Sequence, residues 1–190
     1  YPISHTPVYS LVDSIGQLLD RADGKDYFIP DYLRLVFHPY VKNALYSGSP
    51  ELTRILLQSL QEHFLAGMAR YASLAEIEGD KAFLDSALGR LKHYKDHGGV
   101  TAAEISAHLK GIHDAVIRPF EEIRDIGDFA EKLLGLISFV SSSTTAHRHP
   151  YWAHFSGSFL SLLDRVSGSA LAPESFVSRS SYFKFFADAV

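Results

Sequence analysis

The sequence lacks several residue types that carry common chemistry. It contains no cysteine, one methionine and one tryptophan among 190 residues. Without thiols the chain forms no disulfide, no thiolate metal site and no cysteine nucleophile, which agrees with a reducing compartment and predicts a cytoplasmic location. No apolar run reaches the roughly 18 residues of a membrane-spanning helix, and the first residues have no signal-peptide pattern, so we expect neither a membrane span nor export.

Clustered positive charge is absent as well. The chain has 18 Lys and Arg against 22 Asp and Glu, a formal net charge of −4, and its basic residues are scattered. Nucleic acids and anionic membranes attract clusters of basic residues, so we expect neither as a partner. There is also no P-loop, no dinucleotide-binding glycine motif and no serine nucleophile motif, so the sequence points to no enzyme of those classes.

The sequence has enough apolar surface for one domain. Hydrophobic residues make up 46% of the chain, and aromatic residues, mostly 13 Phe and 10 Tyr, make up 13%. A chain of this length typically folds around one core, so we expect a single domain over residues 1–190. An aromatic core of this kind suits a flat or bulky ligand, although ligand-free proteins also contain such cores.

Apolar periodicity and helix-start residues predict an all-α fold of about seven to eight helices without a sheet. The "TAAE" stretch at 101–104 is a capping box, and we expect Pro30, Pro50 and Thr101 each to lie within about two residues of a helix start. The predicted helices cover 6–24, 30–48 with a bend at Pro39, 49–74, 80–99, a segment from 101, 128–144, 150–167 and 173–190. The side chains with an inward phase, which should form the core, are Leu56, Leu60, Phe64, Leu84, Leu88, Leu91, Ile105, Leu109, Ile112 and Val116.

Histidines are the strongest candidates for chemistry. At about 100° per residue, His63 falls within the apolar arc of its helix, where it is either a core imidazole bonded to a neighbour or a ligand. The same count turns His93 away from the apolar face unless the last helical turn is loosened. His93 and His97 have the spacing of two metal ligands on one helix face, with Asp96 between them, but no third or fourth ligand is identifiable. Three other histidines flank a proline turn and should face solvent; they are His147, His149 and His154.

Three successive stretches cover about residues 30–118. They read "DYLRLVFHPYVKNALYSGS", "ELTRILLQSLQEHFLAGMARYAS" and "LGRLKHYKDHGGVTAAEISAHLKGI". In this order they resemble the second helix with its corner, the distal helix, and the proximal helix with its successor in the globin superfamily, most nearly bacterial globins and globin-coupled sensors. The resemblance implies a globin-like helical sandwich with a core at about 30–145 and extra C-terminal helices.

The resemblance also implies a cofactor and its site. His93 matches the proximal iron ligand of heme b, and His63 or Gln61, with Tyr32, matches the polar groups on the distal side. The domain would then bind or sense a diatomic gas (O₂, NO or CO) through a histidine-ligated iron. Leu45 stands where globins place a phenylalanine before the distal helix, which is a departure from the family pattern. The cofactor-binding positions implied in this way are Tyr32, Leu45, Tyr46, Gln61, His63 and His97.

An alternative function needs no heme. Some globin-fold sensor domains use the same helical sandwich to bind an apolar ligand or to transmit a signal. Under this interpretation the chain is a sensor or interaction domain without catalysis, with an aromatic cavity for an apolar ligand and with a fused output domain or a second copy as its partner.

The heme hypothesis predicts a coloured protein. Protein produced with a supply of heme should show a Soret band, because an imidazole nitrogen is a good axial ligand for heme iron. His93→Ala should weaken that band in the absorption spectrum. Colourless protein that does not respond to added hemin would contradict the hypothesis and leave the alternative.

Overall fold

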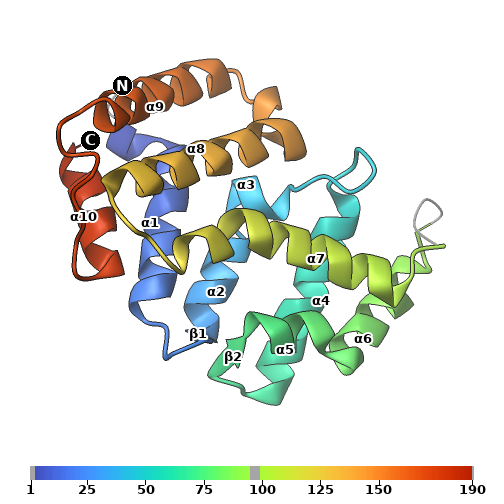
Figure 1. Ribbon diagram of the computed structural model, residues 1–190. Helices are drawn as coiled ribbons and strands as arrows, with labels where there is room; N and C mark the ends of the chain where they lie inside the picture. Colours follow the sequence, from blue (N-terminus) through green and yellow to red (C-terminus); the bar gives the residue numbers. More distant parts are fainter. Residues whose placement is uncertain (1–2, 95–98, 190) are drawn as a thin grey trace.

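A computed structural model describes residues 3–94 and 99–189 as an assembly of helices (Figure 1). The predicted all-α fold class is confirmed. Short 3-10 helices lie at Ile3–His5 (η1), Arg118–Phe120 (η2) and Thr145–Arg148 (η3). The α-helices are α1 (Pro7–Asp20), α2 (Ile29–Val36), α3 (Pro39–Lys42), α4 (Glu51–Gly67), α5 (Leu74–Gly79), α6 (Lys81–Leu91), α7 (Ala102–Val116), α8 (Ile126–Ser143), α9 (Trp152–Ser167) and α10 (Arg179–Ala189).

One feature differs from the expectation of no sheet. β1 (Asp26–Phe28) and β2 (Tyr71–Ser73) form an antiparallel pair in which Tyr27 lies opposite Ala72. Each strand has three residues, whereas an average strand has about five or six. Three residues are too few to produce a recognisable alternation of apolar and polar residues in the sequence. Each strand runs directly into a helix, so the pair joins two helix–strand–helix units, α1–β1–α2 and α4–β2–α5.

The predicted helix starts are confirmed. Pro30 is in the first turn of α2, Pro50 is the N-cap of α4 and Thr101 is the N-cap of α7. At Thr101 the hydroxyl oxygen accepts a hydrogen bond from the Glu104 amide at 3.3 Å, and the Glu104 carboxylate accepts one from the Thr101 amide at 2.8 Å. These two bonds satisfy amides that have no partner within the helix.

Two predicted helices are too long at their C-terminal ends. The helix expected over 49–74 ends at Gly67, because Met68 has a left-handed backbone with φ of 52° and turns the chain toward β2. A second capping box, formed by Ser73 and Glu76, then starts α5. The helix expected over 80–99 ends at Leu91, and its last part lies outside the described residues.

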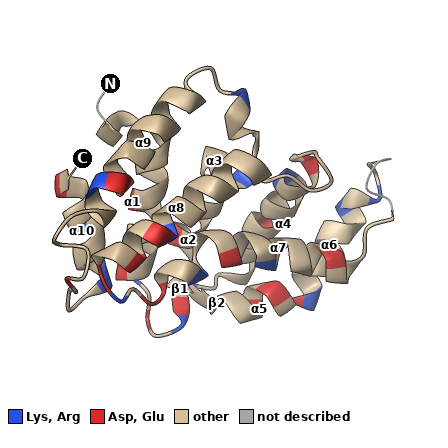
Figure 2. Cartoon of the chain, turned by 45° about the horizontal axis from the view of Figure 1, so that its top comes forward, with Lys and Arg blue, Asp and Glu red and all other residues tan. Residues whose placement is uncertain are grey.

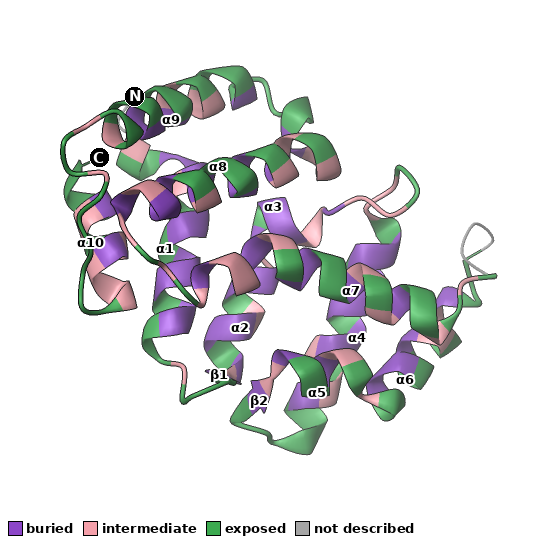
Figure 3. Cartoon of the chain, in the orientation of Figure 1, coloured by how far each residue is buried: buried purple, intermediate pink, exposed green. Residues whose placement is uncertain are grey.

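The hydrophobic core runs through the whole assembly (Figure 3). Of the ten side chains predicted to face inward, all are buried except Leu88, which is partly buried. Burying each large apolar side chain contributes about 1.5–3 kcal/mol. In Figure 1 the elements divide into two groups, with α4 packed on α6 at one end and α8 on α9 and α1 on α10 at the other.

The contact between α1 and α10 gives a test of this packing. A Cβ at Gly16 would lie 2.9 Å from Cγ of Phe183, so we expect Gly16→Ala to lower the free energy of unfolding by about 1–3 kcal/mol through overpacking. Gly89 in α6 has no heavy atom within 4 Å of the same position. Gly89→Ala is the matched control and should be neutral or stabilising by up to about 1 kcal/mol, because alanine favours the helix. Urea unfolding measures both, and equal midpoints for the two variants would contradict the packing.

Candidate functional site

A half-buried ion pair joins α4 to the start of α6. Nε2 of His63 lies 2.9 Å from Oδ2 of Asp80, and the two side chains are 31% and 33% exposed. Asp80 is the N-cap of α6, and its other oxygen accepts a hydrogen bond from the Phe83 amide at 2.9 Å. The capping bond fixes the carboxylate, and the carboxylate in turn orients the imidazole. The ring of His63 also packs beside Phe64 and Phe83, with centroid distances of 5.8 and 6.2 Å.

This ion pair lies in the wall of a pocket of about 540 Å³. Ligand pockets commonly have volumes of roughly 300–1,000 Å³ and are mostly apolar with a few polar groups. The pocket lies between the end of α4, β2, α5 and the start of α6, so it exists because Met68 reverses the chain after α4. Tyr71 is 46% exposed and Met68 87% exposed, which leaves apolar surface uncovered at or beside the pocket. The lining residues are Leu60, His63, Phe64, Gly67, Ala69, Tyr71, Ala72, Ala75, Glu76, Ile77, Gly79, Asp80 and Phe83.

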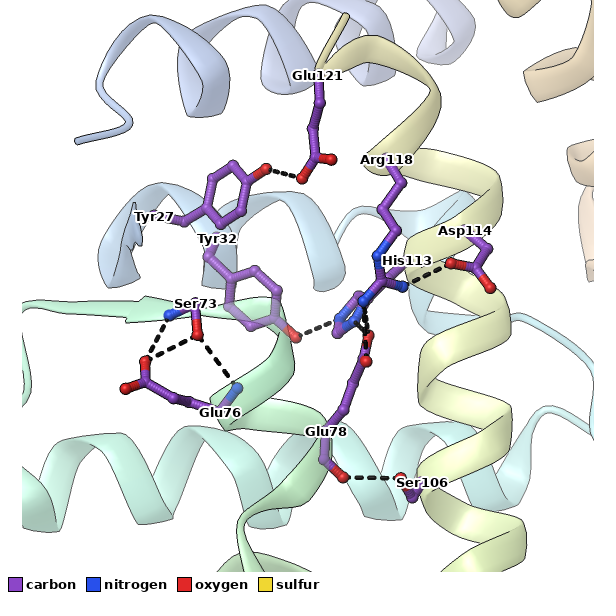
Figure 4. Close-up of polar contacts among 10 residues, drawn as sticks. All are labelled: Tyr27, Tyr32, Ser73, Glu76, Glu78, Ser106, His113, Asp114, Arg118 and Glu121. Carbon is purple, nitrogen blue, oxygen red and sulfur yellow. Dashed lines mark hydrogen bonds and ion pairs between the residues drawn. The ribbon is translucent and has the colours of Figure 1, made fainter. Parts of the chain in front are cut away.

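A second set of polar groups connects α2, α5 and α7 around the buried side chains of Tyr32 and His113 (Figure 4). The Tyr32 hydroxyl lies 2.8 Å from Nε2 of His113, and Nδ1 of His113 lies 2.6 Å from the Glu78 carboxylate. Arg118 donates to both oxygens of Glu78 at 2.7 and 2.9 Å and to Asp114 at 2.6 Å. These contacts connect α2, α5, α7 and the segment that follows α7.

The electrostatics of this set define its protonation. Burial raises the pKa of Glu78, but the hydrogen bonds from His113 and Arg118 outweigh burial and hold that pKa below its usual value. Burial lowers the pKa of His113 and raises that of Tyr32. The arrangement consistent with all three is an ionised Glu78, a neutral His113 that donates from Nδ1, and a neutral Tyr32 that donates to Nε2.

The burial of Tyr32 and His113 indicates that this set has a structural role. Tyr32 and His113 are each 0% exposed, and neither lines the pocket beside His63. A substrate therefore has no access to the tyrosine or the imidazole. Sequence analysis missed His113 and Glu78, although His113 follows Ile112 on the inward face of α7 and its phase alone indicates a buried imidazole.

The residues predicted to surround a heme do not line one cavity. Tyr32 lies in the buried set, whereas His93 is exposed in the turn after α6, where its amide donates to the Arg90 carbonyl at 3.1 Å. The exposed position agrees with the phase count, which turned His93 away from the apolar face. His63 lines the pocket beside Asp80, where its imidazole already has a partner, so the residues present do not fit an axial pair around a porphyrin.

The remaining predicted positions are also dispersed. Gln61 lines a different hollow, near Lys42 and Arg54. Leu45 and Tyr46 are partly buried, and the ring of Tyr46 packs on His108 at 5.2 Å. His97 lies outside the described residues. The three histidines expected in solvent are exposed; they are His147, His149 and His154.

The described residues provide no cluster of ligands for a metal ion. Among residues 3–94 and 99–189, no group of three or more His, Cys, Asp or Glu is placed to hold a metal ion. The two helix–strand–helix units have the layout of helix–loop–helix calcium motifs, whose loops supply several oxygen ligands. The buried Asp31, however, pairs with Arg21 at 3.3 Å and Arg34 at 3.1 Å. The turn that leads into β2 carries no carboxylate at 68–70, so these loops do not fit calcium.

In the view of Figure 2, Lys and Arg positions are interspersed with Asp and Glu positions over the described helices. No helix in the described part of the chain is long and apolar enough to cross a bilayer.

The buried His38 and the partly buried His108 generate a prediction about pH. Burial lowers the pKa of both His38 and His108 to about 4, with Lys42 adding to the effect at His38. In the unfolded chain both titrate near their usual value of about 6.5, so between these values the unfolded state binds more protons. The free energy of unfolding should therefore fall as the pH is lowered through this window, by roughly 1–3 kcal/mol for each histidine.

A substitution tests the origin of that loss. Nε2 of His108 lies 2.7 Å from the Thr53 hydroxyl, and His108→Gln removes the titrating ring while keeping a polar side chain. Urea unfolding at about pH 7 and about pH 4.5 should show a smaller loss of stability for this variant than for the wild type. The same substitution at the exposed His147 is the control. An unchanged pH dependence in His108→Gln would contradict the assignment.

Comparison with known proteins adds no family to this description. No protein-family model matches the chain, and no curated protein and no solved structure matches it. The resemblance to globins therefore stays a prediction, and the function has to be argued from the pocket and its residues.

Proposed function

We propose that this chain is a binding domain that takes a small, largely apolar molecule in the pocket beside His63 and Asp80. The pocket itself carries the proposal, because its volume of about 540 Å³ and its lining of mainly apolar residue types with three polar ones suit a small molecule. Rings of Phe64, Tyr71 and Phe83 contribute to that lining. Apolar surface that a ligand removes from water contributes about 25 cal/mol per Å².

The ion pair supplies a polar contact for such a ligand. Nε2 of His63 is occupied by Asp80, whereas no hydrogen bond to its Nδ1 is found among the described residues. That nitrogen is the free hydrogen-bonding position of a ring whose orientation is fixed. A small number of fixed polar groups in an apolar pocket orients a ligand and gives specificity.

The chemistry of the lining supports binding more than reaction. The lining includes no Ser, Thr, Cys or Lys, which are the usual nucleophiles beside a histidine base. The buried Tyr32 and His113 and the partly buried Glu78 resemble a proton-transfer chain, but none of the three lines the pocket. A sensor or carrier without catalysis is the function that this arrangement supports best.

Heme binding with gas sensing remains the competing proposal. It has less support from the geometry, because His93 is exposed and does not line the pocket with His63. The absorption spectrum of protein supplied with hemin distinguishes the two, since an apolar organic ligand produces no Soret band.

Filling the pocket tests the proposed function. Ala75 on α5 is exposed and lines both this pocket and the hollow beside β1, so Ala75→Trp should fill space at the pocket without disturbing the core. A neutral environment-sensitive dye such as Nile red should bind the wild type with increased fluorescence, and Ala75→Trp should weaken that binding about tenfold or more, equivalent to about 1.4 kcal/mol.

The matched control is Ala82→Trp, which places the same ring on exposed α6 outside the pocket lining. Its dye affinity should equal that of the wild type. Equal affinity in all three proteins would place the dye elsewhere and would contradict the proposed binding pocket.

A further inference from the structure

The pocket beside His63 also has a distinct charge, and this inference rests on the proposed function. We propose that it selects a lipophilic ammonium, that is, an amine group carried on an apolar or aromatic body. Glu76 and Asp80 line the pocket, whereas no Lys or Arg does so. The lining therefore carries two carboxylates and no permanently cationic side chain.

Both carboxylates are held in place by helix caps. At the start of α6, Asp80 accepts a hydrogen bond from the Phe83 amide. At the start of α5, Glu76 accepts hydrogen bonds from the Ser73 amide at 2.8 Å and from the Ser73 hydroxyl at 3.0 Å. The hydrogen bonds from Ser73 lower the pKa of Glu76, which favours its ionised form. Because capping has already fixed both side chains, a ligand that pairs with them loses little of their conformational freedom.

The helix ends oppose this charge but do not cancel it. Each helix N-terminus behaves as roughly +0.5 of an elementary charge, and α5 and α6 are both short. The two carboxylates contribute about −2 and the two helix ends about +1, so these four groups together remain negative. A ligand anion is therefore repelled and a ligand cation attracted.

The aromatic part of the lining favours the same class of ligand. An ammonium group placed over the face of Phe or Tyr is attracted by the ring, and the attraction grows where water is excluded. Among the lining rings, Tyr71 on β2 is 46% exposed and Phe64 on α4 is 8% exposed, whereas Phe83 on α6 is fully buried. An aliphatic or aromatic amine can then pack its body mainly against Tyr71 and direct its charge toward Asp80 or Glu76.

The hollow beside β1 differs from the pocket in its charges. A cavity of about 370 Å³ beside β1 is lined by Lys25, Arg118 and Arg179 together with Glu121 and Glu122. Its charges have both signs, and Arg118 is already paired with Glu78 and Asp114. This hollow gives no preference for a ligand of either charge.

Three probes with one carbon framework test the inference. Phenylpropylamine, phenylpropanol and phenylpropionate differ mainly in carrying a positive, a zero and a negative charge. Binding to the full chain is measured by ligand-observed NMR with titration at constant ionic strength. The amine should bind tightest, at least about tenfold more tightly than the carboxylate, and added salt should reduce this ratio.

Two conservative substitutions remove the charge while keeping the caps. Glu76→Gln preserves a capping box, and Asp80→Asn preserves an N-cap, since Gln and Asn serve these positions well. In the double variant the preference for the amine over the carboxylate should fall about tenfold. The control double variant is Glu104→Gln with Asp125→Asn, which makes the same two changes in the cap of α7 and the cap of α8, away from the pocket. Circular dichroism and thermal unfolding are used to test whether both double variants are folded.

The outcomes separate the inference from the proposed function. An amine preference that Glu76→Gln with Asp80→Asn abolishes, and the control retains, supports the inference. Equal binding of the three probes, tighter binding of the carboxylate, or a preference that survives the loss of both charges overturns it while the binding pocket stands. If none of the three probes binds, and the Nile red affinity is also insensitive to Ala75→Trp, the proposed function fails as well.

Discussion

The ion pair between Glu78 and Arg118 is the interaction on which the pocket depends. α5 has six residues and forms one wall of the pocket, yet a helix of that length is unstable alone. Glu78 anchors it by contacts to Arg118 and His113, and the Glu78 carbonyl accepts a hydrogen bond from Ser106 of α7 at 2.7 Å. A nearly buried carboxylate is tolerated only because both of its oxygens are paired.

The pairing of β1 with β2 completes this support. The strand pair joins the segment before α2 to the segment before α5, and the Ile29 amide extends it by a bond to the Arg70 carbonyl at 2.9 Å. Tyr32, one turn into α2, reaches His113 on α7. The pocket wall is thus held from one side by backbone hydrogen bonds and from the other by the side-chain contacts of Tyr32, His113, Glu78 and Arg118.

How far the sequence predicts this structure depends on how local each signal is. Pro30, Pro50 and Thr101 act within one helical turn, so the helix starts were predictable. The phase count also placed His93 correctly in solvent, although its spacing from His63 suggested a ligand. The pairing of His113 with Glu78, 35 residues apart, is a tertiary contact, and a single sequence does not indicate which carboxylate meets which imidazole. The partner of His63 was likewise not predictable, because Asp80 reaches it from another helix.

Met68, the residue that ends α4 and turns the chain toward β2, has a consequence for oxidative chemistry. It is the only methionine in the chain and is 87% exposed. Peroxide reaches its thioether without any unfolding, and oxidation converts that group into a polar, chiral sulfoxide. Its neighbours Gly67 and Ala69 line the pocket, so the oxidised side chain would lie beside the pocket. Because the chain has no thiol, this thioether is its only sulfur atom.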